Sequence, residues 1–208
     1  MVSRYEFLAA LHALLIPRGY LEVGVYAGGS LNLASCPAIG VDPAPMVAAQ
    51  GRQRIYSTTS DIFFANGIPE DFPPIDLGFI DGMHQFEFAL RDFRNIEKFG
   101  HRKTIITFDD VLPYNKAIAD RNPLPGDWTG DIWKMVPILE KRGNVELRLV
   151  DVSPTGVLLV KGLDPTDRFL WDNYEELVAE WIDKDVPDWA VDRSTSYTPE
   201  SVLEWLTQ

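Results

Sequence analysis

Two apolar runs that end abruptly in acidic residues constrain the fold of this 208-residue chain more than any other feature. Residues 75–80 (IDLGFI) lead into Asp81, and residues 104–108 (TIITF) lead into Asp109 and Asp110. In a chain that alternates strands and helices, such runs are predicted to be neighbouring buried parallel strands, whose carboxyl ends open on the crevice where ligands bind. The three carboxylates are therefore predicted to converge at one edge of a sheet.

A cluster of three carboxylates is costly because like charges repel each other unless a cation neutralises them. Oxygen ligands suit magnesium, manganese or calcium better than zinc, so Asp81, Asp109 and Asp110 are predicted to bind a divalent metal ion. His84 follows Asp81 by three residues and is predicted to lie over the same crevice as a general base. The alternative is structural, because acids that follow strands are also common as helix caps and turn residues.

A glycine-bearing loop follows the first predicted strand. Residues 20–31 contain an apolar strand, a loop with Gly24, Gly28 and Gly29, and a short predicted helix that begins at Ser30. Glycines let the backbone approach a ligand and the first N–H groups of a helix are unpaired, so the loop is predicted to bind a cofactor. Its spacing differs from the Gly-x-Gly-x-x-Gly of dinucleotide-binding enzymes and from a phosphate loop, which leaves an ordinary turn as the alternative.

Polar residues at the ends of the next two predicted strands are also candidates for binding the cofactor. Asp42 lies roughly 20 residues past the glycine loop, where an acid accepts hydrogen bonds from ribose hydroxyls. The alternative is that Asp42 and Pro43 start a turn. Ser60 and Asp61 follow a third strand, either as the cap and first turn of a helix or as contacts to an adenine ring.

The remaining elements predict an α/β chain of five strand–helix alternations closed by a hairpin. A helix over residues 3–16 precedes the first strand. Residues 85–99 read as an amphipathic crossover helix, with residues such as Asp92 and Glu97 counted on its polar side. Two strands over residues 145–150 and 155–160 are joined too closely for a crossover, so they are predicted to pair antiparallel.

Residues 111–133 lose this periodicity and carry prolines, glycines and polar side chains. A long irregular segment directly after an acidic pair is predicted to be a lid or a substrate loop. Its candidate acceptor contacts are Tyr114, Trp128, Thr129 and Asp131. Trp128 suggests stacking on a sugar, with anchoring of the loop to the core as the alternative.

The whole chain, residues 1–208, is expected to form one domain with a core over about residues 18–162 and a helical extension over residues 163–208. Aromatic residues of the extension either pack on their own domain or contact a second subunit, so a homodimer is one expectation. A net charge of −12, from 31 acidic and 19 basic residues, argues against nucleic acid as a partner. With one cysteine, no membrane-length apolar run and no signal-peptide pattern, a soluble cytoplasmic protein is expected.

Together, these segments resemble class I S-adenosylmethionine-dependent methyltransferases over roughly residues 18–162. The stretch from Glu22 to Gly28 is similar to the first motif of that family, and the terminal hairpin to its antiparallel seventh strand. The resemblance implies a Rossmann-like seven-stranded sheet, mostly parallel and flanked by helices, that binds S-adenosylmethionine. The cofactor contacts that it implies, together with those predicted above, are Glu22, Gly24, Tyr26, Gly28, Ser30, Asp42, Ser60, Asp61 and Asp81.

More narrowly, residues 79–84 (FIDGMH) with Asp109 and Asp110 are similar to a metal-dependent branch that contains macrolide-sugar O-methyltransferases and cephalosporin-hydroxylase-like relatives. In that branch the equivalent acids bind magnesium, and the histidine three positions after the first aspartate is the proposed base. The resemblance implies an O-methyltransferase that uses magnesium, or manganese, and acts on a small glycoside or oligosaccharide, for example a methylated mannoside. A catechol-type O-methyltransferase and a metal-dependent hydroxylase or hydrolase are the alternatives. The glycine loop begins too early to leave room for the N-terminal auxiliary region of the sugar enzymes. A lid is therefore expected from residues 111–133, the C-terminal helices or a partner subunit.

Overall fold

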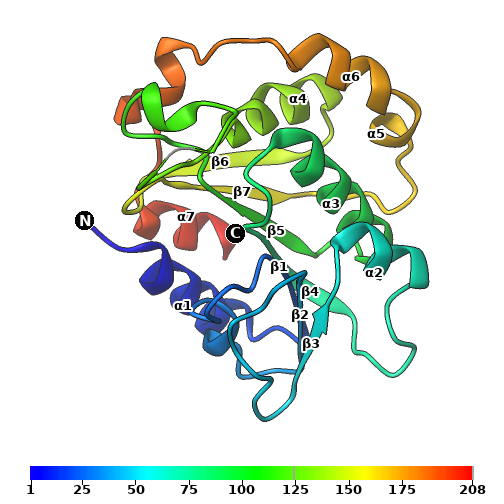
Figure 1. Ribbon diagram of the computed structural model, residues 1–208. Helices are drawn as coiled ribbons and strands as arrows, with labels where there is room; N and C mark the ends of the chain where they lie inside the picture. The colour runs from blue at the N-terminus through cyan, green and yellow to red at the C-terminus, as the bar shows by residue number, and fades with distance from the viewer. Residues whose placement is uncertain (124, 208) are drawn as a thin grey trace.

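The computed structural model describes residues 1–123 and 125–207, which form one seven-stranded sheet with helices on both faces (Figure 1). The order of the strands across the sheet is β3-β2-β1-β4-β5-β7-β6. Neighbours from β3 to β5 are parallel, and β7 runs antiparallel between β5 and β6. The strands are β1 (Gly19–Val23), β2 (Ala38–Asp42), β3 (Gln53–Ser57), β4 (Ile75–Ile80), β5 (Ile105–Asp109), β6 (Glu146–Val150) and β7 (Val157–Lys161). The predicted Rossmann-like sheet with its antiparallel terminal hairpin is confirmed.

Most helices cover one face of the sheet, where the larger hydrophobic core lies. They are α2 (Ser60–Asn66), α3 (Phe86–Phe99), α4 (Met135–Arg142), α5 (Phe169–Asp172) and α6 (Tyr174–Trp181). Leu21 and Val23 of β1 point to this face, and the apolar side of α3, including Phe93, packs against the same core. Asp92 and Glu97 of α3 are also buried, which corrects their placement on the polar side of that helix. Burial of Glu97 is matched by Arg142 of α4, which donates to it at 2.7 Å.

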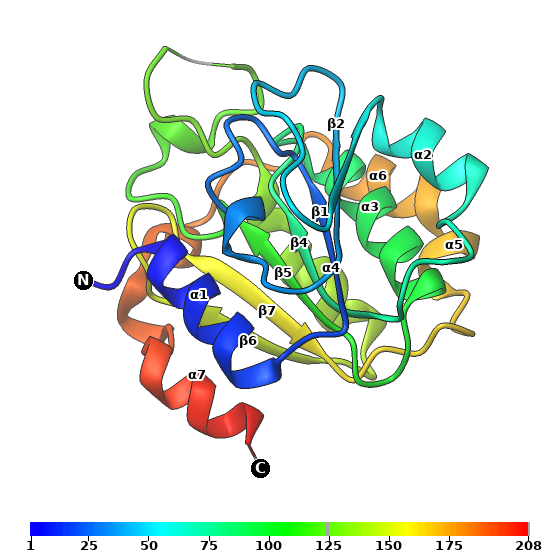
Figure 2. The ribbon, with the colours of Figure 1, turned by 90° about the horizontal axis from the view of Figure 1, so that it is seen from below.

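Two terminal helices, α1 (Arg4–Leu15) and α7 (Pro199–Leu206), cover the other face and lie side by side, as Figure 2 shows. Phe7 and Leu11 of α1 pack with Tyr20 of β1 and Val202 of α7 in a second core. Between β1 and β2 the chain forms only a single 3-10 turn, η1 (Leu31–Leu33), and Ser30 makes no cap bond to it. The predicted short helix after the glycine loop is therefore much reduced, since α1 and α7 cover this face instead.

Aromatic residues of the C-terminal extension pack on the rest of the same chain. Trp171 receives the guanidinium of Arg94 at 4.2 Å, and Trp205 receives the ammonium of Lys161 at 3.8 Å. The indole of Trp181 meets Trp133 edge to face at 6.2 Å. The extension is thus part of the domain, and contact with a second subunit stays a prediction. None of the helices in the described ranges combines the length and apolarity needed to cross a bilayer.

The predicted lid, residues 111–133, contains two short 3-10 turns among irregular backbone. They are η2 (Ala117–Ala119) and η3 (Ile132–Lys134), and α4 follows η3 directly. Two further turns, η4 (Asp188–Val191) and η5 (Arg193–Thr195), join α6 to α7. Ala119 and Trp133 share a small apolar cluster with Ala190 of η4, so the C-terminal extension supports the base of the lid.

Candidate active site

The pairing of β4 with β5 brings the predicted acidic cluster together. Ile80 and Phe108 are partners in this parallel pair, so Asp81 and Asp109 leave the sheet at the same edge. Asp110 follows with a φ of +63°, a left-handed conformation that is uncommon for a residue with a side chain. Convergence of the three acids, inferred from two strand endings in the sequence, is what the topology produces.

His84 lies between two of these acids. Its Nε2 is 3.4 Å from an oxygen of Asp81, and its Nδ1 is 3.2 Å from an oxygen of Asp110. One ligand atom from each of the three residues lies within 4.8 Å of the others, which is a spacing suited to a shared metal ion. The backbone of His84 is also left-handed, with a φ of +53°, and such strain is typical of functional sites.

Asp109 is oriented differently from its two neighbours. One of its oxygens is paired with the guanidinium of Arg4 from helix α1. The other oxygen is buried and has no hydrogen-bond partner among the described residues. The structure thus places Asp109 beside the cluster with one oxygen free of hydrogen bonds among the described residues and the other paired with Arg4.

The charges of this site are strongly coupled. Burial, together with Asp81 and Asp110, raises the pKa of Asp109 well above its ordinary value. Burial raises the pKa of Asp110 to about 6, with Asp81 adding to the effect and His84 opposing it. Although burial opposes the charge of His84, Asp81 and Asp110 raise its pKa to about 9. Crowded acids with an orphaned oxygen fit a hard divalent cation, and such a cation would lower the pKa of His84.

Residues of the lid hold His84 in place. Its Nδ1 is 2.9 Å from the carbonyl oxygen of Trp128, and the indole of Trp128 stacks on the imidazole at 5.1 Å between ring centroids. The backbone N–H of Asp131 donates to the carbonyl oxygen of His84 at 3.2 Å. At Gly130, a Cβ atom would lie 1.6 Å from that same carbonyl oxygen, so only glycine fits there. The lid and the candidate base are therefore one packed unit.

The glycine loop lies next to this unit. Gly24 has a φ of +91°, and a Cβ atom there would lie 1.8 Å from the carbonyl oxygen of Asp81. Gly28 is also left-handed and packs against Val47. Tyr26, between them, is exposed and has a φ of +43°. The loop after β1 thus contacts the end of β4 through backbone alone, as a cofactor cradle requires.

Asp42, at the end of β2, holds the glycine loop. One of its oxygens accepts hydrogen bonds from the backbone N–H groups of Val25 and Tyr26 at 2.9 and 2.8 Å. The other accepts from the backbone N–H of Ala44 at 2.7 Å. Each carboxylate oxygen has two acceptor sites, so these bonds leave capacity for a ligand. Contact with a ribose stays a prediction, and the structure adds a second role for Asp42.

Glu22 and Ser30 lie beneath the loop and face each other. The carboxyl of Glu22 is fully buried, and it accepts hydrogen bonds from the hydroxyls of Tyr20 at 2.6 Å and Ser30 at 2.9 Å. Burial raises the pKa of Glu22 to about 8. The structure gives both residues an internal role in supporting the loop, and their contact with a cofactor stays a prediction.

Glu22 is expected to make the free energy of unfolding fall as the pH rises. Between about pH 5 and pH 8 the folded protein keeps a proton on Glu22 that the unfolded chain has released, so stability decreases across this range and levels off above it. The Glu22→Gln variant is neutral throughout and should lack this part of the pH dependence. Urea unfolding of both proteins at several pH values measures the difference. Parallel profiles would contradict the prediction.

Ser60 and Asp61 open helix α2, but Thr59 is its N-cap, with its hydroxyl accepting from the N–H of Ile62. Asp61 forms a two-point ion pair with Arg91 of α3 at 2.8 and 2.9 Å, and is half exposed. The hydroxyl of Ser60 faces the buried Asp92, whose pKa burial raises to about 7. Adenine contacts from Ser60 and Asp61 stay predictions.

The four predicted acceptor contacts are placed in two groups. Tyr114 is exposed and donates to Asp127 at 3.0 Å, and Trp128 is partly exposed beside His84. Thr129 is buried, and its hydroxyl donates to the carbonyl of Ile118 at 3.0 Å. Asp131 is buried too, so the structure gives Thr129 and Asp131 a role in holding the predicted lid, and their contact with an acceptor stays a prediction.

Two residues that contact the site, Arg4 and Gly130, are not marked by any motif or spacing in the sequence. Arg4 lies 105 residues from Asp109 along the chain and looks like an ordinary polar residue of an amphipathic helix. Gly130 is one of several glycines in the irregular segment, and only its contact with His84 sets it apart. Both depend on how distant segments meet.

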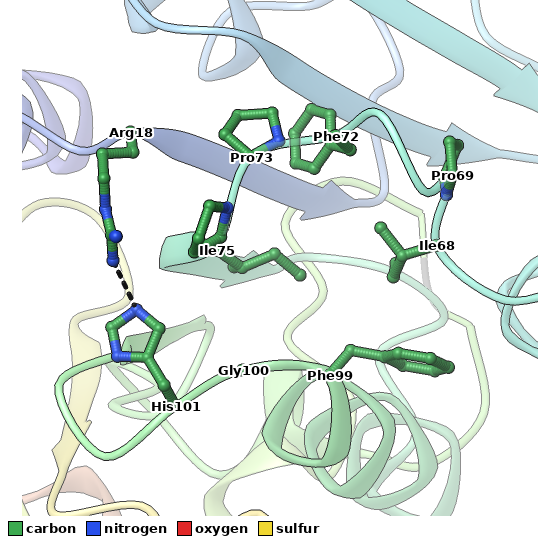
Figure 3. A pocket seen from close by; sticks show the side chains of 10 residues that line it. Arg18, Ile68, Pro69, Phe72, Pro73, Ile75, Phe99, Gly100 and His101 are labelled. Carbon is green, nitrogen blue, oxygen red and sulfur yellow. Dashed lines mark hydrogen bonds between the residues drawn. The ribbon is translucent and has the colours of Figure 1, made fainter.

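A cavity of about 560 Å³ lies away from this site, at the opposite ends of the strands. Figure 3 shows Arg18 and His101 at one side of it and Ile68, Phe72 and Phe99 at the other. Both Arg18 and His101 bind Asp76, at 2.7 Å, so the polar groups of this cavity satisfy each other. It has none of the residues predicted for the reaction.

Comparison with known proteins agrees with the fold. Residues 21–111 match a family described as a methyltransferase domain, a segment that runs from β1 through all three acids. A protein of Acanthamoeba polyphaga mimivirus, described as uncharacterized protein R132, is 28% identical over 131 aligned positions. The alignment covers 49% of this chain and 59% of the viral protein, so this chain matches little more than half of that relative.

Several solved methyltransferases share the fold at low identity. PaMTH1 of Podospora anserina, with bound S-adenosylhomocysteine, is 17% identical with a TM-score of 0.61, covering 79% of this chain and 80% of its own. The O-methyltransferase of Bacillus cereus, with the same ligand, is 15% identical with a TM-score of 0.55, covering 77% and 82%. MycE of the mycinamycin biosynthetic pathway, in complex with magnesium, S-adenosylhomocysteine and mycinamycin VI, is 16% identical with a TM-score of 0.51, covering 72% and 46%.

These findings define the fold. The family match covers residues 21–111, less than half of the chain, and the likeness to the solved structure of PaMTH1 extends the shared fold to 79% of the chain. The chain has the fold of the solved methyltransferases, and residues 21–111 match the methyltransferase-domain family, as the sequence resemblance implied.

Proposed function

We propose that the protein is a magnesium-dependent O-methyltransferase whose acceptor is a hydroxyl group of a sugar. The observation that carries the proposal is the position of His84 between Asp81 and Asp110, at the sheet edge on which the glycine loop opens. Gly24 packs directly against the backbone of Asp81, so a methyl donor on the loop and an acceptor at His84 are neighbours. Methyl transfer requires this in-line proximity.

His84 supplies the proton-accepting group. When its Nδ1 carries a hydrogen, it donates to the carbonyl of Trp128, which leaves Nε2 to accept the hydroxyl proton of the acceptor. The tautomer and the ring plane are thus set by the lid. Packing of Trp128 against the ring also excludes water from one face of the imidazole.

Asp81 and Asp110 would hold the metal ion, with the free oxygen of Asp109 behind them. When bound, a divalent cation stabilises the negative charge that develops on an acceptor oxygen. Two adjacent hydroxyls suit chelation, and both sugars and catechols offer them. The polar lid with its exposed Tyr114 and partly exposed Trp128 favours a sugar, on which aromatic rings stack.

The first test is calorimetric titration of S-adenosylhomocysteine into the purified protein, with magnesium and then with a chelator. We expect micromolar binding in the presence of magnesium. An absence of binding under both conditions would contradict the assignment of the glycine loop. Methyl transfer to panels of sugar diols and catechols, with and without chelator, then separates the two acceptor classes and tests the need for a metal.

His84→Ala is expected to lower turnover by about 10²- to 10⁴-fold, the usual contribution of a general base, while S-adenosylhomocysteine still binds. His12→Ala is a matched control, because His12 is buried in α1 on the other face of the sheet. Wild-type turnover in the His84 variant would remove the proposed base from the mechanism.

A further inference from the structure

Arg4 is a positively charged residue of this site to which the proposed function assigns no role. It stands in the first turn of α1, where Ser3 caps the helix, and its backbone N–H donates to the carbonyl of Ser153 at 3.0 Å. Ser3 and Ser153 also form a bridge between the start of the chain and the turn that joins β6 to β7. The position of Arg4 is therefore fixed by backbone contacts that do not depend on its side chain.

The guanidinium of Arg4 turns from this anchor into the acidic cluster. It pairs with Asp109, and it also donates to the hydroxyl of Tyr5 at 3.2 Å. Its side chain is 25% exposed, whereas that of Asp109 is 1% exposed. Burial opposes the charge of Arg4, but Asp109 and Asp81 raise its pKa, so it stays a cation in this environment.

Positive groups of the protein already contact the three carboxylates, so fewer carboxylate charges are left to bind a metal ion. Within the described residues, the positive groups in contact with the three carboxylates are Arg4, on Asp109, and His84, between the other two. A divalent cation that enters at Asp81 and Asp110 meets the fixed positive charge of Arg4 on the third carboxylate. Like charges at such short range repel each other strongly in a partly buried site.

We propose that Arg4 is a built-in cation that neutralises Asp109 and thereby lowers the affinity of the acidic cluster for divalent metal ions. The inference rests on the proposed function in that it takes Asp81 and Asp110 as the metal ligands. Asp109 then pairs with Arg4 and does not bind the metal ion. The ion is held by the charges of Asp81 and Asp110 alone, so it dissociates readily. Arg4 is a positioning residue in this scheme, because it acts on the metal through Asp109.

The test measures metal binding directly, with Mn²⁺ as the probe and the paramagnetic resonance signal of free Mn²⁺ as the readout. Arg4→Gln removes the charge but keeps the backbone contacts to Ser153. We expect it to bind Mn²⁺ about tenfold more tightly than the wild type or better, since tenfold is the effect of one unit charge about 6 Å from a divalent ion even at the dielectric constant of about 80 of bulk water. Arg4→Lys keeps a positive charge and should stay within a few-fold of the wild type.

Arg54→Gln is the matched control for the loss of one positive charge. Arg54 lies on the edge strand β3, where it pairs with the exposed Asp71. Its substitution should leave Mn²⁺ affinity unchanged. Circular dichroism confirms the fold of each variant, and calorimetric titration of S-adenosylhomocysteine, expected to be unchanged by Arg4→Gln, checks the cofactor site separately.

The outcomes distinguish this inference from the proposed function. Tighter Mn²⁺ binding by Arg4→Gln alone supports the inference. Equal or weaker binding by Arg4→Gln overturns it while the metal site of the proposed function stands. Lack of Mn²⁺ binding by all variants overturns both. A loss of S-adenosylhomocysteine binding in Arg4→Gln with unchanged Mn²⁺ affinity also overturns it, and assigns Arg4 to the cofactor instead.

Discussion

Replacement of Gly130 by alanine is expected to slow methyl transfer strongly while cofactor binding persists. The new Cβ atom would lie 1.6 Å from the carbonyl oxygen of His84, and the left-handed φ of +58° is itself unfavourable for alanine. The lid backbone must therefore move away from His84. Because Trp128 and Asp131, on either side of Gly130, make the contacts that hold His84, the imidazole loses its fixed orientation.

The expected loss is about 100-fold in turnover or more, since displacements of about 1 Å at a reacting group cost that much. Turnover is measured with whichever acceptor the wild type methylates, and S-adenosylhomocysteine binding is measured by calorimetry. Gly126→Ala is the matched control. Gly126 lies in the same loop with a φ of +90°, but a Cβ atom there meets nothing within 4 Å. Equal losses in both variants would show that backbone strain alone, and not contact with His84, causes the effect.

Replacement of Asp131 by asparagine is expected to be the most destabilising of the conservative changes in the lid. One oxygen of Asp131 accepts from the N–H of Phe86 at 2.8 Å, at the start of α3. The other accepts from Arg121 at 3.0 Å and from Lys134 at 2.9 Å. Lys134 is buried, and its other hydrogen-bond acceptor is the carbonyl of Ile182. The variant leaves this ammonium without its counter-ion.

Loss of one partner from a buried ion pair costs about 3–5 kcal/mol. Urea unfolding of the Asp131→Asn variant measures this loss, and Asp127→Asn is the matched control, since Asp127 is exposed in the same loop. The double variant Asp131→Asn with Lys134→Met should regain most of the stability, because a buried apolar side chain needs no counter-ion. A loss below about 1 kcal/mol in the single variant would mean that Lys134 finds water or another acceptor.

The sequence alone determined the architecture and the edge of the sheet at which the predicted acids meet. Strand-length apolar runs that end in Asp81 and in Asp109 predict parallel neighbours. Because the carboxyl ends of parallel strands coincide, convergence of these acids with His84 follows from local pattern. The glycine loop and the terminal hairpin were equally local, since spacing and turn length specify them.

Only the tertiary structure decided which partner each of these side chains takes. Arg4 reaches Asp109 because α1 packs on the far face of the sheet and is pinned to the turn at Ser153. Glu22, Thr129 and Asp131 are turned inward, where burial and distant hydrogen-bond partners give them structural work. The longest of these side-chain contacts, from Arg4 to Asp109 and from Phe86 to Asp131, join segments 105 and 45 residues apart, and nothing in the spacing along the chain encodes them. The sequence therefore predicts where the candidate site lies, and the packing of α1 and of residues 111–133 decides the charge and the geometry of its side chains.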